Sequence, residues 1–271
     1  MIEIMLGQLR SFYDIPGLSP EIVLMAAGLA LVFGLIWLSI FRPWRHRNIS
    51  WIWVLITGAV LTWAAIAFIQ VPLQIWTQDG LVAMLGQEGF IQWLYLSGIP
   101  IVLISGLIQE ASKLLPVTVA WFTRKKHLEA SAGFYYGAIS GAGFGVMEAI
   151  WVHNMIFASG WSWQVVTLSG PTALLGFIER FFSIGFHIAA SALAGYGWAT
   201  GRRWQYFLLA AVLHGLLNYA AVLGAKNAFS IVYIEIYIAV IAIAAAAYAF
   251  WVMRRSRVKT EVVVPETPPA L

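Results

Sequence analysis

The sequence predicts an all-α fold: a polytopic membrane bundle of about seven transmembrane helices. Composition is the first observation behind this prediction, because 61% of the 271 residues are hydrophobic and only 10% are charged, whereas a soluble domain has about 25% charged residues. The second is that the apolar residues gather in runs of about 20, the length that a helix needs to cross a bilayer. The third is the placement of Lys and Arg in short clusters between these runs, which is how membrane topology is encoded.

About seven apolar runs are long enough to be membrane spans. The segments between them are shorter or more polar, and we predict them as loops. The longest, residues 73–92, carries Asp79 and Glu88 but no Lys or Arg. The residues before the first span are typical of a short amphipathic lead-in rather than of a cleavable signal peptide. The predicted spans are residues 21–41, 51–72, 93–122, 131–157, 171–200, 204–223 and 230–253.

Basic residues follow the first, third, fifth and seventh predicted spans, and the other loops carry only Lys226. This alternation follows the positive-inside rule, so we expect the N-terminus outside and the C-terminus in the cytoplasm. The clusters indicate a lipid bilayer, and no nucleic acid, as the partner. Without a targeting sequence, we expect a multi-pass protein of a prokaryotic plasma membrane. The clusters are Arg42, Arg45 and Arg47; Arg124, Lys125 and Lys126; Arg202 and Arg203; and Arg254, Arg255, Arg257 and Lys259.

The domain organisation that follows is simple. We expect one integral membrane domain over residues 1–259, with the helices of the functional site in residues 93–223. Residues 260–271 are Pro-rich and polar, which predicts a disordered cytoplasmic tail. The chain has no cysteine, so disulfides and thiol catalysis are excluded.

A glycine repeat marks the fourth predicted span, where Gly133, Gly137, Gly141 and Gly145 recur at every fourth position. Positions four apart share one face of a helix. A face without side chains lets the backbone of another helix come close, as small residues do in membrane proteins. Glu148 follows Gly145 on the same side, so we expect this face to bring a carboxylate against a neighbouring helix.

Polar and ionisable side chains occur at membrane depth in four consecutive predicted spans. Such residues cost several kcal/mol in hydrocarbon, usually face the bundle interior, and mark function by default. At about 1.5 Å per residue they lie at similar levels, so we predict that they converge on one site. They are Glu110 and Lys113 in the third span, Glu148 in the fourth, Arg180 and His187 in the fifth, and His214 and Asn218 in the sixth.

Structural explanations also exist for some polar residues taken singly. Glu110 and Lys113 are three residues apart on one helix and can form a buried ion pair. Glu179 and Arg180 are expected to pair near the outer part of the fifth span. His153 lies near the outer end of the fourth span, where we expect it to be solvated.

An ordered set of motifs on these helices resembles a known family: Gln109-Glu110-Ala-Ser-Lys113, Phe144-Gly-Val-Met-Glu148, Arg180 followed by His187, and His214-Gly-Leu-Leu-Asn218. The set is similar to the PrsW/YhfC group of intramembrane proteases, in the wider clan that includes the CAAX prenyl endopeptidases. The resemblance covers roughly residues 106–219. It implies hydrolysis of a peptide bond within or near the bilayer, in a membrane protein or peptide. The family pattern begins with two glutamates, and Gln109 stands in place of the first.

The predicted site residues support acid–base chemistry. A glutamate can act as general base on a water, and a histidine can donate a proton to the leaving amine. Amides and guanidinium groups can stabilise a developing oxyanion. We assign Glu110 and Glu148 as acid or base, His187 and His214 as proton donors or ligands, and Lys113, Arg180 and Asn218 as groups that orient or stabilise charge.

The same residue types could instead hold a metal. Two histidines and a carboxylate resemble a catalytic zinc set with one open position, and His187, His214 and Glu148 would be the ligands. No His-Glu-x-x-His spacing occurs, and the ligands would come from separate helices. We therefore favour, by a small margin, a glutamate mechanism that needs no cofactor, with zinc as the alternative.

Two other functions stay open at this point. Glu, His and Arg near the bilayer midplane also serve proton-coupled carriers. A carrier predicts an inverted repeat, and we find none in the sequence. The glutamine at position 109 keeps open a third function, a catalytically inactive relative that binds a membrane partner.

Overall fold

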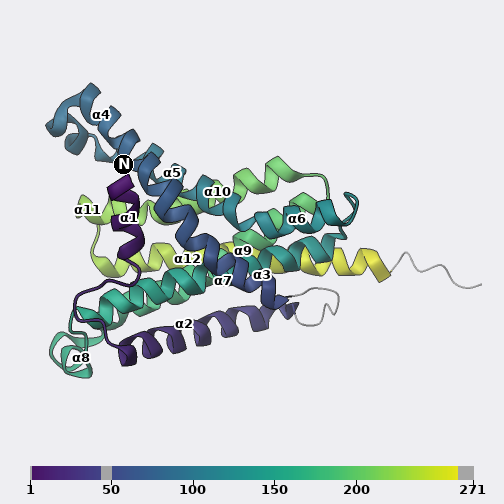
Figure 1. Cartoon of the computed structure of the whole chain (residues 1–271), viewed down its shortest axis with the longest axis horizontal. Coiled ribbons are helices and arrows are strands. Elements are labelled where there is room, and N and C mark those ends of the chain that lie inside the picture. Colours follow the sequence, from purple (N-terminus) through teal and green to yellow (C-terminus); the bar gives the residue numbers. More distant parts are fainter. Residues whose placement is uncertain (1, 44–50, 262–271) are drawn as a thin grey trace, which may run out of the picture.

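The computed structural model describes residues 2–43 and 51–261, and every regular element in this part of the chain is helical. Long helices lie side by side along one axis, and α4 projects away from the others (Figure 1). The elements are α1 (Ile2–Arg10), α2 (Pro20–Phe41), α3 (Trp51–Ala65), the π-helical turn η2 (Ile66–Gln70), α4 (Val71–Gln92), α5 (Leu94–Lys113), α6 (Leu115–Thr123), α7 (Ala130–Ala158), α8 (Trp163–Ser169), the 3₁₀ helix η3 (Gly170–Leu174), α9 (Leu175–Ala199), α10 (Arg203–Asn218), α11 (Ala220–Ala225) and α12 (Ile231–Glu261).

The predicted all-α class is confirmed. In the part of the chain that the structure describes, six helical segments are long and apolar enough to cross a membrane. The fourth predicted span corresponds to α7, a helix of 29 residues that is not one of the six. Its glycines, tyrosines and Glu148 lower its hydropathy, so the count of seven stays a prediction. The six are Pro20–Phe41, Trp51–Gln92, Leu94–Thr123, Trp163–Ala199, Arg203–Ala225 and Ile231–Arg255.

The predicted loop over residues 73–92 is wrong, because α4 occupies it. Pro72 has no N–H to donate, and proline usually breaks or kinks a helix, but α4 continues past it. The wider turn η2 comes directly before it, and the N–H of Val71 bonds to the carbonyl of Ile66. Gly86 (φ 71°) then kinks α4. The polar residues that favoured a loop therefore lie on a helix.

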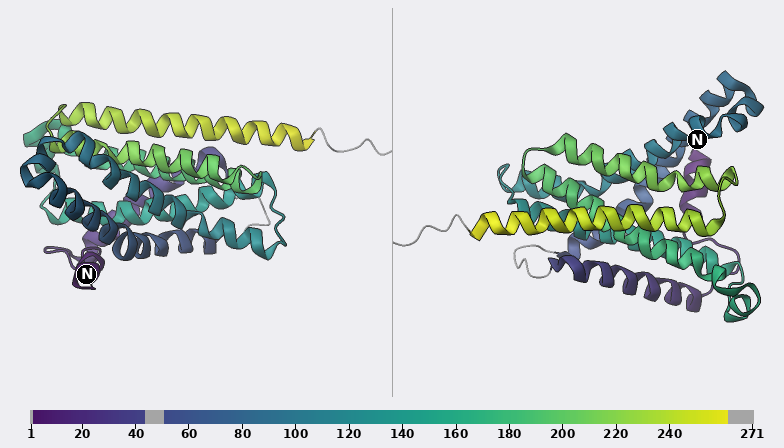
Figure 2. Two further views of the ribbon diagram at one scale, coloured as in Figure 1. Left: turned by 90° about the horizontal axis from the view of Figure 1, so that it is seen from above. Right: turned by 180° about the vertical axis from the view of Figure 1, so that it is seen from behind.

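Parts of the predicted organisation lie outside the described residues. These are Arg45 and Arg47 of the first basic cluster and residues 262–271 of the predicted tail. Within the described residues, α12 continues to Glu261 and runs along the outside of the bundle (Figure 2).

Helix α7 lies at the centre of the bundle. Every residue from Ala132 to Gly145 is buried, and the helix packs on α9, α3 and α2. A helix that is buried on all sides needs no apolar stripe, which explains how it accommodates so many glycines. The predicted solvation of His153 is wrong for the same reason. Its side chain is fully buried, with Nδ1 3.4 Å from the carbonyl oxygen of Ala26 and the ring of Phe33 nearby.

The glycine face of α7 packs directly against the backbone of α9. A Cβ atom at Gly137 would collide with the carbonyl of Ser191, and one at Gly141 would collide with the carbonyl of His187. The contact is reciprocal, because a Cβ atom at Gly195 would collide with the carbonyl of Gly133. The expected close approach is confirmed, and the partner helix is the one that carries His187.

We expect Gly137→Val to lower the stability of the protein. The added side chain would force α7 and α9 apart, and overpacking of this kind costs about 1–3 kcal/mol. The midpoint of thermal unfolding in detergent, followed by tryptophan fluorescence, measures the effect. Gly28→Val is the matched control, because no atom lies within 4 Å of a Cβ at Gly28. Equal midpoints for the two variants would contradict the tight contact.

Candidate active site

Four helices bring the predicted ionisable residues to one place in the bundle. Two of these helices, α7 and α9, are held together by the glycine contact, and α10 packs on both α5 and α9. The residues that converge are Glu110 and Lys113 from α5, Glu148 from α7, Arg180 and His187 from α9, and His214 from α10.

Glu110, like Lys113, has no exposed side-chain surface. Its Oε1 lies 2.6 Å from Lys113 Nζ and 2.7 Å from His214 Nδ1. Its Oε2 accepts a longer hydrogen bond, 3.4 Å, from Ser191 Oγ. The predicted ion pair of Glu110 and Lys113 is thus present, one turn apart at the end of α5, and His214 also bonds to its carboxylate.

Lys113 links Glu110 to the second histidine. Its Nζ lies 2.9 Å from His187 Nδ1, and His187 Nε2 lies 2.9 Å from Glu148 Oε2. An ammonium group can only donate hydrogen bonds, so Nδ1 accepts and Nε2 carries the proton that it donates to Glu148. The ring has room there because residue 145 is glycine: a Cβ at Gly145 would lie 3.1 Å from two atoms of the His187 side chain.

Arg180 extends the network on the other side of Glu148. One guanidinium nitrogen lies 3.7 Å from Glu148 Oε2, and the group also binds both carboxylate oxygens of Glu179. The expected pairing of Glu179 with Arg180 is therefore confirmed. Charges alternate in sign from Glu110 through Lys113, Glu148 and Arg180 to Glu179, which offsets the cost of removing each ion from water.

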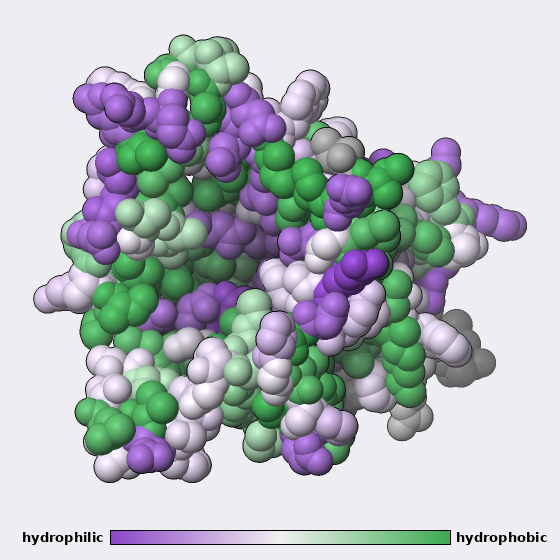
Figure 3. Space-filling model, turned by 60° about the vertical axis from the view of Figure 1, so that its left-hand side comes forward, coloured by the Kyte–Doolittle hydropathy of each residue, from purple (hydrophilic) through white to green (hydrophobic). Residues whose placement is uncertain are grey.

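A cavity of about 480 Å³ adjoins the network. Glu148, Glu179 and Arg180 line it, whereas Glu110 and the two histidines do not. Asn218 also lines it but is outside the network, because its amide donates a 2.6 Å hydrogen bond to Ser105 Oγ. Viewed from the end of the bundle that carries α4 and α11, the surface is hollowed, and hydrophilic residues line the hollow (Figure 3).

A row of glutamines on one wall of this cavity was not foreseen. Gln70, Gln74 and Gln78 line it from η2 and α4. Gln70 accepts a 2.9 Å hydrogen bond from the amide of Gln109, and Gln74 donates one of 2.9 Å to the carbonyl of Ile101. Their spacing of four residues is a helical signal, and the loop prediction for residues 73–92 concealed it.

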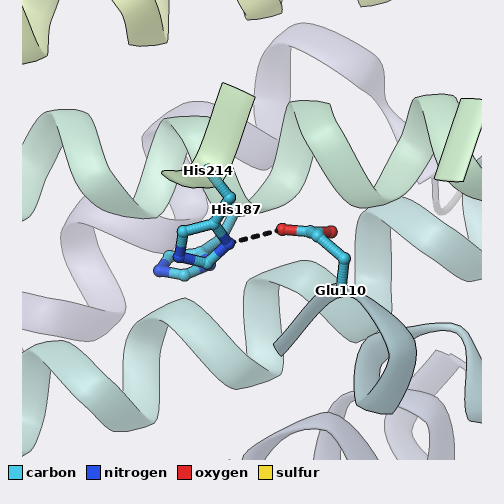
Figure 4. Close-up of side chains that lie close together, drawn as sticks. All are labelled: Glu110, His187 and His214. Carbon is cyan, nitrogen blue, oxygen red and sulfur yellow. Dashed lines mark hydrogen bonds and ion pairs between the residues drawn. The ribbon is translucent and has the colours of Figure 1, made fainter. Parts of the chain in front are cut away.

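The donor set for a metal consists of Glu110, His187 and His214, whose ligand atoms lie within 4.8 Å of one another. Figure 4 shows the Glu110 carboxylate facing the two imidazole rings. The set differs in its carboxylate from the predicted one, since Glu148 binds the far nitrogen of His187. The donor types fit zinc, and a carboxylate behind a ligating histidine is a common supporting contact. Lys113 Nζ contacts two of the three donors.

Comparison with known proteins gives one match. The model of the PrsW family, described as an intramembrane metalloprotease family, matches residues 42–248, which is most of the chain. The match includes every residue of the network and the glutamine row. No curated protein and no solved structure matches the chain.

We expect Lys113→Met to destabilise the protein strongly, because it leaves the buried Glu110 carboxylate without its ammonium partner. Breaking a buried pair from one side costs about 3–5 kcal/mol. The double variant Glu110→Gln/Lys113→Met should lose less than the sum of the two single changes, since it leaves no unpaired charge. Chemical unfolding in detergent measures these free energies. Lys125→Met, at an exposed lysine, should have little effect, and additive losses would contradict the pairing.

Proposed function

The chain belongs to the PrsW family of intramembrane metalloproteases, and on this premise we propose that it hydrolyses a peptide bond of a membrane protein or membrane-embedded peptide. It is a multi-pass membrane protein. One observation carries the assignment of chemistry to residues. Glu148 both hydrogen-bonds a network histidine and lines the 480 Å³ cavity, so it joins the charged network to the space in which a substrate would lie.

Glu148 is the group that we assign as general base. Its side chain is 15% exposed, whereas that of Glu110 has no exposed surface, so a water in the cavity can reach Glu148. His187 does not line the cavity and holds the carboxylate in position through Nε2–H, while Glu148 passes the proton that it takes from the water on to the leaving amine. Glu110 and Lys113 act behind His187, fixing which of its nitrogens carries the proton.

We assign stabilisation of the developing oxyanion to the other polar groups on the cavity wall. Arg180 and Asn218 both line the cavity and present N–H donors. Donors of this kind, fixed in place before the reaction, are worth several kcal/mol at the developing charge. The glutamine row provides further amides on the wall formed by η2 and α4, where an extended peptide could form main-chain hydrogen bonds.

The family is one of metalloproteases, and Glu110, His187 and His214 are the residues that would hold an ion. When bound, zinc supplies Lewis acidity for hydrolysis of a carbonyl compound. Lys113 opposes metal binding, because its ammonium group contacts Glu110 and His187 and competes with a cation for their donor atoms. In the alternative without a metal, Lys113 stays in place, and Glu148 acts as the base with His187 holding it in position.

We also propose seven spans, with α7 crossing the membrane inside a ring of the other helices. The basic residues support the orientation with the C-terminus in the cytoplasm. They follow the ends of α2, α6 and α9 or lie at the end of α12, and these helix ends lie together at one end of the bundle (Figure 1). The cavity opens toward the opposite end. A prokaryotic plasma membrane is the location that we infer from this arrangement.

Cleavage by the reconstituted protein tests the proposed function. We expect Glu148→Gln and His187→Ala each to lower the rate by about 10²–10⁴-fold, the usual contribution of a general acid or base. The measurement is product formation from a transmembrane peptide in proteoliposomes, by mass spectrometry. His153→Ala is the matched control, because it removes another fully buried histidine that is outside the network.

Two outcomes would overturn this assignment. Full activity of both site variants would exclude Glu148 and His187 from the chemistry. Cleavage by Gln109→Glu but not by the native chain would favour the inactive relative. Comparison of membrane proteomes from cells with the native protein and with Glu110→Ala would identify the substrate as the membrane protein that accumulates uncleaved.

Metal content decides between the two mechanisms. If zinc is the cofactor, the purified native protein should retain about one zinc per chain after dialysis, as a set of two histidines and a carboxylate predicts. His214→Ala should lose it, and His153→Ala should keep it. Elemental analysis by plasma mass spectrometry gives the stoichiometry. Full cleavage activity in a metal-free preparation would establish the glutamate mechanism instead.

A further inference from the structure

A second cavity, of about 320 Å³, lies at the end of the bundle where the basic residues gather. It shares no lining residue with the 480 Å³ cavity that adjoins the charged network. Its walls come from α5, α6, the end of α9 and the start of α10. The lining residues are Ala111, Leu114, Thr118, Trp198, Arg203, Trp204 and Phe207.

Arg203 is the charged group in this cavity, and two indole rings hold it. Its guanidinium carbon lies 4.1 Å from the ring centre of Trp121 and 5.1 Å from that of Trp198. Stacking of this kind fixes the plane of the group while leaving its N–H edge free to donate. No carboxylate among the described residues forms an ion pair with Arg203, so its charge is not neutralised in that part of the chain.

Arg203 Nε and Trp198 Nε1 are buried donors next to the cavity, and neither has a hydrogen-bond partner within the described part of the chain. Both groups can only donate, so the ligand that satisfies them must supply acceptors. Lys126 adds positive charge close by, with Nζ 5.9 Å from the ring centre of Trp121. A site with free donors, positive charge and no acid in its lining is suited to an oxyanion.

The surroundings of the cavity are apolar and exposed. Trp204 is 72% exposed and Leu115 46% exposed. Val119 on α6 and Leu208 on α10 are also exposed, which in a membrane protein means that they face lipid. Aromatic residues at this position are typical of the interface between headgroups and acyl chains. The oxyanion that fits is therefore one attached to long apolar chains.

We propose that this cavity binds the phosphate of an anionic phospholipid, with Arg203 and Trp198 as the donors and the acyl chains on the exposed faces of α6 and α10. Basic pockets between transmembrane helices bind lipid headgroups in this way. The site is next to the charged network along the chain, because the lining residues Ala111 and Leu114 directly follow Glu110 and Lys113 in sequence.

Lipid titration of the full chain in detergent, followed by native mass spectrometry, tests the proposal. We expect the native protein to retain one phosphatidylglycerol more tightly than phosphatidylcholine. Arg203→Gln should weaken phosphatidylglycerol binding about tenfold or more, as loss of a charge-assisted hydrogen bond predicts. Arg202→Gln is the matched control, since it removes the same charge at the adjacent residue, which lines a different cavity.

A second variant keeps the test valid if Arg203→Gln does not fold. Thr118→Leu retains Arg203 and fills part of the cavity, so it too should weaken phosphatidylglycerol binding. Equal affinity in the native protein and in the variants that fold, or equal loss with Arg202→Gln, would overturn the site. Displacement of the lipid by millimolar inorganic phosphate would assign the cavity to a soluble anion instead and overturn the lipid assignment.

Discussion

The close contact between the backbones of α7 and α9 is the constraint on which the rest of the structure depends. Glycines at positions 133, 137 and 141 remove the side chains that would hold these helices apart. The 2.9 Å hydrogen bond between Glu148 and His187 crosses the same interface. Because the bond joins the two helices just beyond the glycine contact, a small increase in their separation would break it. Packing and chemistry are thus set by one surface of α7.

The buried charges impose a second constraint. Each ion taken out of water costs several kcal/mol, and at least five are gathered here, from Glu110 to Glu179. This cost is offset because each ion either contacts an ion of opposite sign or is joined to one through a histidine. The network also makes the site rigid: Glu110, with no exposed surface, fixes Lys113 and His214, and these in turn fix His187. Only Glu148, Arg180 and Glu179 are left to face the cavity. Of the two carboxylates that face the cavity, Glu148 is the one that also hydrogen-bonds a histidine of the network.

Local sequence signals were enough to predict most of the helices and the ionisable residues that meet. Helix geometry is the same in every helix, so spacing along the chain shows which residues share a face and which lie at the same depth. The spacing of the glycines, of the carboxylate that follows them and of the polar residues in four successive spans could therefore be interpreted from the sequence. Where prediction failed, the cause was a local irregularity of the helix in one case and an interaction with a distant segment in the other. Residues 73–92 look like a loop because of their polar residues, but a π-helical turn accommodates Pro72 and the helix continues. His153 looks solvated from its position in the span, but α2, distant in sequence, covers it.

The sequence by itself determined the helical class, the membrane character and the set of groups that would have to share a site. These follow from composition and from the periods along single helices. Only the tertiary structure decided where each carboxylate lies and which groups it contacts. In the sequence, Glu110 and Glu148 are each an acid in an apolar helix, and only Glu110 has a basic neighbour one turn away, Lys113. The packing of α10 against α5 places Glu110 beside His214. The packing of α7 against α9 places Glu148 beside Nε2 of His187 and at the wall of the cavity. Which helices touch is a property of the whole bundle, and no single segment encodes it.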